Sequence, residues 1–157
     1  MTSLADADRR LLDAAIAQAE KSRDQGGIPI GAALGAPDGT VLALGHNLRV
    51  QTGDTTAHAE VVCLRNAGRR RDWDQLTLAT TLSPCIMCTG ASLLHRIPRI
   101  IIGENETFLG GENLLREQGV ALVHAHDPRC RDLMHRFIES FPELWNEDIG
   151  VPEDEDS

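Results

Sequence analysis

Two short segments of this sequence hold residues of the types that bind zinc and move protons. The first is His58-Ala59-Glu60, and the second is Pro84-Cys85-Ile86-Met87-Cys88. Zinc favours thiolate sulfur and imidazole nitrogen, and a catalytic zinc site uses three protein ligands so that water can take the fourth position. His58, Cys85 and Cys88 provide one such set, and Glu60 adds a carboxylate beside it. The pattern therefore predicts a catalytic zinc centre.

Both segments are predicted to open helices. Proline suits a first helical turn because its missing N–H is not needed there, and the helix dipole favours anionic sulfur at Cys85 and Cys88. In the middle of a helix, residues two apart point roughly 200° from each other, so His58 and Glu60 could not easily share a site. At a helix start the entering backbone is not yet regular, and both side chains can converge. We therefore expect the site to lie where two helices begin.

Other interpretations of these residues remain open. A C-x-x-C pair can be a thioredoxin-like redox motif, although that motif does not account for His58 or Glu60. A purely structural zinc would need a fourth ligand. The histidines that could supply it have no diagnostic spacing: His46, His95, His124, His126 and His135. Cys63 and Cys130 fall within predicted helices and are expected to be small buried residues.

Apolar patterning predicts about five strands and five helices around the two segments. Strands are expected at 30–36, 40–45, 76–80, 99–103 and 120–125, and helices at 4–25, 58–70, 84–95, 112–118 and 127–140. Ser3 is the expected N-cap of the first helix, and Pro37-Asp38-Gly39 is the expected turn of an opening hairpin. A hairpin followed by alternating strands and helices indicates the α/β class. We expect a three-layer α/β/α sandwich with a central five-stranded mixed sheet.

Length and charge indicate one domain that acts on small molecules. The chain has 157 residues, of which 41% are hydrophobic, and we expect one domain over 1–150 and an acidic, flexible tail over 151–157. The net charge of −9 repels nucleic-acid phosphates, so a nucleic-acid partner is not expected. Neither an export signal nor an uncharged stretch of about 18 residues is visible. We therefore expect no membrane partner and a cytoplasmic location.

At the two metal segments the sequence resembles the cytidine deaminase superfamily, whose signature is H-x-E followed by P-C-x-x-C. The wider match, roughly over 12–150, is to the fungal type of cytosine deaminase. It includes the segments Gly27-Ile28-Pro29-Ile30-Gly31, Gly45-His46-Asn47, Thr81-Leu82-Ser83-Pro84-Cys85, Cys88-Thr89-Gly90-Ala91, Gly103-Glu104-Asn105 and Trp145-Asn146-Glu147-Asp148-Ile149-Gly150. The resemblance implies a cytidine deaminase-like fold, a Zn²⁺ cofactor and a homodimer.

The resemblance also implies which residues bind the substrate, a small heterocyclic base. Asn47 would hold a ring carbonyl and a ring N–H, since an amide offers both a donor and an acceptor. Asp148 would accept hydrogen bonds from the departing amino group. The residues implied to complete the site around the ring are Ile30, Ser83, Phe108 and Trp145.

The implied reaction is hydrolytic deamination, with cytosine, converted to uracil and ammonia, as the first candidate. Zn²⁺ would supply an activated water, and Glu60 would carry protons as acid and base. Val50 and Asn146 stand where phenylalanines are expected near the pocket, which predicts a wider site. Guanine, isocytosine, creatinine and triazine-type substrates therefore remain alternatives. A tRNA adenosine deaminase and a non-catalytic zinc module, which would not require Glu60, are two further alternatives.

Overall fold

The computed structural model describes residues 3–152 and is built around a five-stranded sheet with the strand order β2-β1-β3-β4-β5. The strands are β1 (Gly31–Gly35), β2 (Val41–His46), β3 (Thr77–Thr80), β4 (Arg99–Ile102) and β5 (Ala121–His124). The helices are α1 (Asp6–Asp24), α2 (Arg49–Thr52), α3 (Ala59–Ala67), α4 (Ile86–Leu94), α5 (Glu112–Glu117), α6 (Pro128–Ser140) and α7 (Pro142–Asp148), with a 3-10 turn, η1, at Trp73–Gln75.

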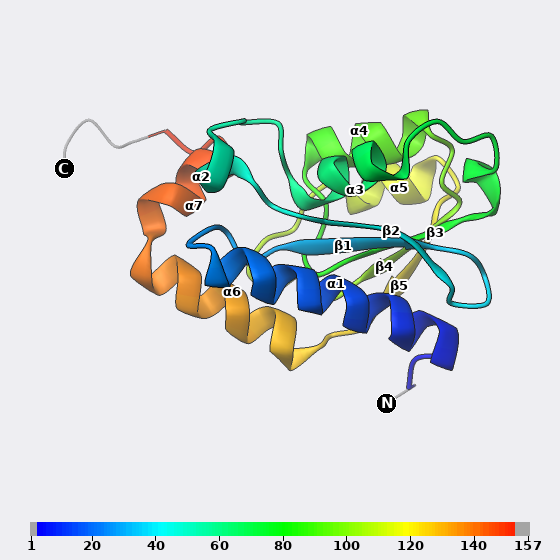
Figure 1. Cartoon of the computed structure of the whole chain (residues 1–157), viewed down its shortest axis with the longest axis horizontal. Coiled ribbons are helices and arrows are strands. Elements are labelled where there is room, and N and C mark those ends of the chain that lie inside the picture. Colours follow the sequence, from blue (N-terminus) through cyan, green and yellow to red (C-terminus); the bar gives the residue numbers. More distant parts are fainter. Residues whose placement is uncertain (1–2, 153–157) are drawn as a thin grey trace.

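Helices cover both faces of the sheet (Figure 1). Helices α3, α4 and α5 lie over one face, and α1 and α6 lie over the other. Strand β1 is antiparallel to β2 and β3, whereas β3, β4 and β5 are mutually parallel. Parallel neighbours need a crossover connection, which α4 and α5 provide. The predicted α/β/α sandwich with a mixed sheet is confirmed.

Both faces of the central strands are buried by apolar side chains. Ala33, Ala79 and Ile101 are aligned partners across β1, β3 and β4, and they pack against apolar side chains of α1. One residue further along, Leu34 and Leu78 are partners that belong to the larger cluster on the opposite face. Successive side chains of a strand point to opposite faces. The same short strands therefore anchor helices on both sides of the sheet.

A glycine on β2 sets the position of α3. A Cβ atom at Gly45 would lie 2.3 Å from the backbone nitrogen of Cys63, which is in α3. A backbone atom cannot move aside as a flexible side chain can. The close approach of α3 to the sheet therefore requires glycine at this position, and it fixes where the N-terminus of α3 lies.

The structure departs from the sequence-based prediction at several elements. The N-cap predicted at Ser3 is wrong, because α1 begins at Asp6 and Ala5 occupies its N-cap position without a side-chain hydrogen bond. Helices α2 and α7 were not predicted. Of the predicted tail, Val151 and Pro152 are exposed and lack regular structure, and 153–157 lie outside the described residues. Within 3–152, no helix combines the length and apolar character needed to cross a membrane.

We predict that Gly45→Ala lowers the free energy of unfolding by about 2 kcal/mol or more, because the added methyl group forces α3 away from β2. Gly90→Ala in α4 is the matched control, since nothing lies within 4 Å of its added Cβ. Higher helix propensity should make that change neutral or stabilising by up to about 1 kcal/mol. Urea denaturation followed by circular dichroism measures both effects. Equal stability changes for the two variants would contradict the close-approach explanation.

Candidate metal centre and active site

Helices α3 and α4 each begin with a metal-binding side chain at the N-cap position. His58 precedes α3 with φ −67° and ψ 155°, and Cys85 precedes α4 with φ −66° and ψ 175°. This extended backbone allows His58 and Glu60, only two residues apart, to line the same cavity. Cys88 follows in the first turn of α4, on a neighbouring part of the surface that Cys85 occupies. The two helix starts thus bring together the four side chains that the sequence singles out.

His58, Cys85 and Cys88, which we call the ligand cluster, have the spacing of a zinc site. One ligand atom of each lies within 4.8 Å of the others. His58 Nδ1 is 3.3 Å from Cys85 Sγ and 3.7 Å from Cys88 Sγ. Tetrahedral coordination with ordinary Zn–S and Zn–N bond lengths separates such atoms by about 3.6 Å. The donor types and their spacing therefore fit Zn²⁺.

The ligand cluster has three members and no fourth. Among residues 3–152 it is the one group of three or more His, Cys, Asp and Glu side chains close enough to hold a metal ion. None of the five histidines considered as a fourth ligand joins it. His46, for example, is held between Gln18 and Gln25. Three protein ligands are typical of a catalytic rather than a structural zinc.

Polar contacts inside the ligand cluster shift its acid–base equilibria. Hydrogen bonding from Cys88, followed by the contact with His58, lowers the pKa of the Cys85 thiol to about 4. Burial on its own would lower the pKa of His58, but hydrogen bonds with Asp148 and Cys85 raise it to about 10. The contact with Cys85, together with burial, raises the pKa of Cys88. A dication takes the place of the protons that these groups hold, so metal binding releases protons.

Asp148 connects the C-terminal helix α7 to the ligand cluster. His58 presents Nδ1 to the two sulfur atoms, while its Nε2 lies 3.2 Å from Asp148 Oδ1. Asn47 Nδ2 donates to the same oxygen at 3.4 Å. Asn47 Oδ1 accepts a hydrogen bond from the backbone N–H of Arg49 at 2.9 Å, which fixes the orientation of the amide. A carboxylate that holds the outer nitrogen of a histidine ligand fixes the tautomer and orientation of its ring.

Glu60 is buried beside the ligand cluster and is held by Thr80. Glu60 is only 3% exposed, and this burial raises the pKa of its carboxyl group. Thr80 Oγ1 lies 2.7 Å from Glu60 Oε1 and 3.0 Å from the carbonyl oxygen of Leu82. Since a hydroxyl has one proton, Thr80 can donate to ionised Glu60, or accept from protonated Glu60 while donating to Leu82. Both protonation states of Glu60 are therefore satisfied in one geometry.

A small cavity adjoins Glu60 and the ligand cluster, with an empty volume of about 250 Å³. Of the residues predicted to bind substrate, the structure places Ile30, Ser83, Phe108, Trp145 and Asp148 around it. The rings of Phe108 and Trp145 meet edge to face with their centroids 5.8 Å apart. Asn47 does not line this cavity and reaches it through its contact with Asp148. The cavity thus combines apolar ring walls with two carboxylates, Glu60 and Asp148.

The two positions predicted to widen the pocket lie outside its lining. Val50 on α2 is 39% exposed, and Asn146 on α7 is exposed as well. Neither residue borders the cavity. The volume of these two side chains therefore does not set the width of the site in this structure.

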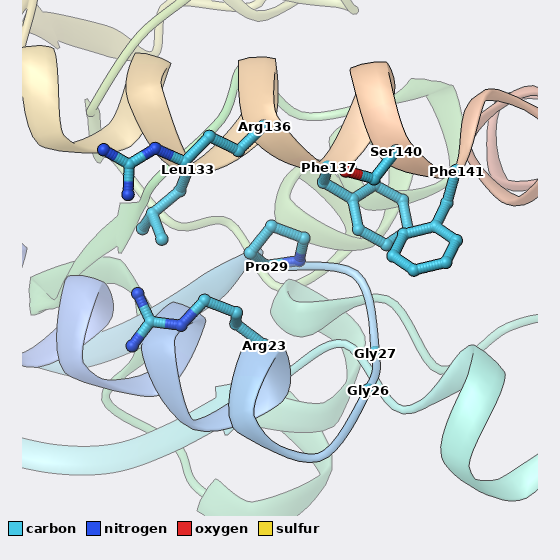
Figure 2. Close-up of a pocket in the computed structure, with 9 residues that line it drawn as sticks. All are labelled: Arg23, Gly26, Gly27, Pro29, Leu133, Arg136, Phe137, Ser140 and Phe141. Carbon is cyan, nitrogen blue, oxygen red and sulfur yellow. The ribbon is translucent and has the colours of Figure 1, made fainter.

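A second cavity lies between α1 and α6 (Figure 2). Pro29, Leu133 and Phe137 contribute apolar lining, and the side chains of Arg23 and Arg136 lie toward one end. Its empty volume is about 550 Å³. None of its lining residues is a histidine, cysteine, aspartate or glutamate. This larger cavity therefore lacks the groups needed for metal binding or proton transfer.

Sequence reasoning missed two polar residues that hold the site together, Thr80 and Glu112. Thr80 is fully buried at the end of β3 and contacts Glu60. Thr80 follows the apolar pair Leu78 and Ala79 at the end of the strand, directly before the segment that leads to Cys85, and this position is a signal that could have pointed to it. Glu112 binds the hydroxyl of Ser83 at 2.6 Å, across 29 positions of sequence. No local pattern indicates that contact, because only the folded chain brings the two residues together.

Comparison with known proteins places this geometry among deaminases. The family model described as the cytidine and deoxycytidylate deaminase zinc-binding region matches residues 5–104. A cytosine deaminase of Candida albicans is 49% identical over 145 residues, covering 91% of this chain and 97% of that protein. A tRNA-specific adenosine deaminase of Streptococcus pyogenes is 38% identical over 104 residues, covering 64% of this chain and 65% of that protein.

A solved structure shares the fold. The guanine deaminase from Nitrosomonas europaea superposes with a TM-score of 0.70 over 87% of this chain and 86% of that one. At 21% sequence identity, this likeness establishes the architecture alone.

We predict that Cys88→Ala abolishes stoichiometric zinc binding, because two protein ligands are left and the affinity depends on the full set. Cys63→Ala is the matched control, since Cys63 is also buried but donates to the carbonyl oxygen of Ala43, outside the ligand cluster. Metal analysis of the purified variants measures the outcome. One zinc per chain in Cys88→Ala, or loss of zinc in Cys63→Ala, would contradict the assignment of Cys88 as a zinc ligand.

Proposed function

This chain belongs to the cytidine and deoxycytidylate deaminase family, and we propose that it is a zinc-dependent deaminase of a free nucleobase. Cytosine, converted to uracil and ammonia, is the first candidate substrate. One observation carries the proposal: buried Glu60 and the ligand-cluster members His58 and Cys85 line one cavity together with the ring walls Phe108 and Trp145. The 49% identity to a cytosine deaminase over nearly the full length of both proteins supports the choice of base.

In this proposal His58, Cys85 and Cys88 hold the metal ion. Bound Zn²⁺ lowers the pKa of a water molecule and so supplies a nucleophile at neutral pH. The chain itself keeps the ligands oriented. Asp148 holds the outer nitrogen of His58, and the start of α4 fixes both sulfur atoms.

Glu60 carries the protons of the reaction. Deamination forms a C–O bond to the carbon that bears the amino group and then breaks the C–N bond of that carbon. Glu60 first carries a proton from water to the ring nitrogen as the C–O bond forms. It then carries the new hydroxyl proton to the amino group, which leaves as ammonia. Thr80 satisfies Glu60 in both of its protonation states, so the carboxyl group need not move between the two steps.

Asp148 and Asn47 orient the base. Within the described residues, Asp148 Oδ2 has no hydrogen-bond partner, so this oxygen is free to accept from the amino group of the substrate. Asn47 acts on the base through Asp148, since its amide nitrogen donates to Asp148 Oδ1 and its amide oxygen is held by the Arg49 N–H. Ile30, Phe108 and Trp145 enclose the flat ring, as apolar and aromatic walls do in small-molecule sites.

The lining of the cavity and the charge of the chain support a free base rather than a tRNA substrate, because apolar ring walls enclose the space beside Glu60. The net charge of −9 also disfavours a tRNA substrate. Guanine is the second candidate, because the guanine deaminase from Nitrosomonas europaea has the same fold. Isocytosine, creatinine and amino-triazines carry the same reacting group and belong in the test.

We further propose a single-domain homodimer in the cytoplasm. Three apolar side chains are strongly exposed, Ile86 (73%) and Leu109 (65%) beside the site and Leu94 (80%) at the other end of α4. An exposed apolar patch of this kind suits a protein–protein interface. All four cysteines are free thiols, as expected in a reducing compartment. Sedimentation should give twice the chain mass of 17.1 kDa, and a monomer at micromolar concentration would contradict the dimer.

We predict that zinc-loaded protein releases ammonia from cytosine faster than from guanine, isocytosine, creatinine or amino-triazines. Glu60→Gln should lower kcat by about a hundredfold to ten-thousandfold with zinc content unchanged, because an amide cannot carry the protons. Glu147→Gln, an exposed residue at the rim of the site, should stay within about twofold of the parent. Full turnover by Glu60→Gln would disprove its role. Release from none of the bases would disprove the activity.

A further inference from the structure

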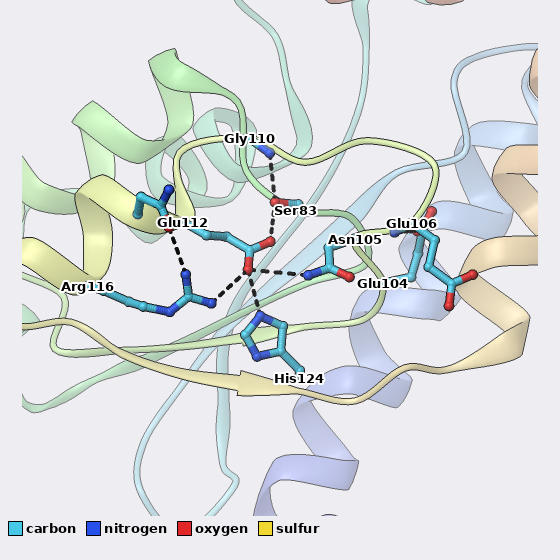
Figure 3. A network of polar contacts seen from close by, with 9 residues as sticks. Ser83, Glu104, Asn105, Glu106, Gly110, Glu112, Arg116 and His124 are labelled. Atoms are coloured by element: carbon cyan, nitrogen blue, oxygen red, sulfur yellow. Dashed lines mark hydrogen bonds and ion pairs between the residues drawn. The ribbon is translucent and has the colours of Figure 1, made fainter.

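One buried carboxylate near the site has no part in the proposed chemistry. Glu112 opens α5, and its side chain is only 1% exposed. Ser83 Oγ donates to Glu112 Oε2 at 2.6 Å, and His124 Nε2 donates to Glu112 Oε1 at 2.6 Å (Figure 3). Burial opposes ionisation, but the hydrogen bonds from Ser83 and His124 outweigh it and lower the pKa of Glu112. The group is therefore a fixed negative charge with donors on both oxygens.

Ser83 uses its hydroxyl entirely within this network. Its proton goes to Glu112, and its oxygen accepts the backbone N–H of Gly110 at 3.0 Å. The hydroxyl is therefore bonded to α5 and the preceding loop and is not available to a substrate. Ser83 lines the cavity, but its side-chain hydrogen bonds serve the loop 103–111.

We call the loop 103–111 the Phe108 loop. Both of its ends are hydrogen-bonded to the Ser83–Cys85 turn, which leads into α4. The Ser83 N–H donates to Glu104 O at 2.9 Å, and the Gly111 N–H donates to Pro84 O at 2.9 Å. The packing at the second contact is tight, since a Cβ atom on Gly110 would lie 1.9 Å from Pro84 O. Between these ends the loop carries Phe108, which lies against Trp145 across the cavity.

A second carboxylate shapes the turn inside the loop. Glu104 accepts hydrogen bonds from the backbone N–H of Glu106 at 2.8 Å and of Thr107 at 3.0 Å, as well as from the Thr107 hydroxyl. Glu104 therefore sets the local conformation of the loop. The bond from Glu112 to Ser83 differs, because it connects the loop and α5 to the turn that carries Cys85.

We propose that Glu112 is a positioning residue that, through Ser83, locks the Phe108 loop to the Ser83–Cys85 turn and so sets the distance between ring wall and metal centre. This inference rests on the proposed function. Without the bond between Glu112 and Ser83, Phe108 would no longer hold the base at the correct position relative to Glu60. Substrate binding would weaken, while the proton-transfer groups on α3 and β3 would keep their places.

The test uses Glu112→Gln in the full-length, zinc-loaded protein. Glutamine keeps the shape, but one carboxylate oxygen becomes an amide nitrogen, so Ser83 and His124 can no longer both donate to it. A hydrogen bond to a charged group changes an equilibrium roughly tenfold to a hundredfold. We expect hydrogen exchange at 104–111 to speed up by about that factor, with exchange in β3 and β4 unchanged. KM for cytosine should rise about tenfold, with kcat within about threefold.

Two further variants make the test decisive. Ser83→Ala removes only the bond between Ser83 and Glu112, so it should reproduce the faster exchange and the raised KM. Combining it with Glu112→Gln should give less than the sum of the two single effects, because the two changes share that bond. Arg116→Gln is the matched control, because Arg116 is 51% exposed and contacts the same carboxylate only at 3.4 Å. It should leave exchange and KM unchanged.

Three results would overturn the proposal: unchanged exchange at 104–111 in both variants, exchange that rises equally throughout the protein, or a fall in kcat without a change in KM. The exchange measurement does not depend on activity. If the protein proves inactive on every base, the lock is still tested, so the two failures are distinguishable.

Discussion

Two helix N-termini that meet beside the sheet impose the constraint on which the rest of the site depends. His58 and Cys85 occupy the N-cap positions of α3 and α4, where extended backbone gives way to helix. The direction of each ligand follows from that change of conformation. The helices are themselves fixed by the core: α3 rests on β2 through the contact at Gly45, and α4 connects the parallel strands β3 and β4. The metal centre is thus held by packed secondary structure rather than by flexible loops.

The opposite side of the cavity comes from later parts of the chain and controls a different property. Helix α7 contributes Trp145 and Asp148, and the loop 103–111 contributes Phe108. The contact between Asp148 and His58 connects α7 directly to the metal centre. In the proposed reaction, Glu60 and the ligand cluster serve proton transfer, whereas α7 and the Phe108 loop set the size and orientation of the substrate.

The features that could be predicted from the sequence are those formed by residues close together in the chain. The ligand cluster and Glu60 sit in two short segments whose helix starts are evident from the residues themselves, and the strands follow from apolar patterning. Helix α7 was missed because it has seven residues and is stabilised mainly by Trp145 packing into the core. The contact between Thr80 and Glu60 depends on where a strand ends relative to a helix. The exposure of Val50 and Asn146 likewise depends on the path of α2 and α7, which patterning does not reveal.

The central claim is that α7 and the Phe108 loop close the site around a free base, and a comparison of cytosine with cytidine tests it most directly. Both carry the same amino group on the same ring, and cytidine adds a ribose that would have to fit between the ring walls Phe108 and Trp145. With zinc-loaded protein, we expect kcat/KM for cytosine to exceed that for cytidine by at least about a hundredfold, which corresponds to about 2.7 kcal/mol of transition-state binding. Equal values for the two substrates, or a preference for cytidine, would contradict the account.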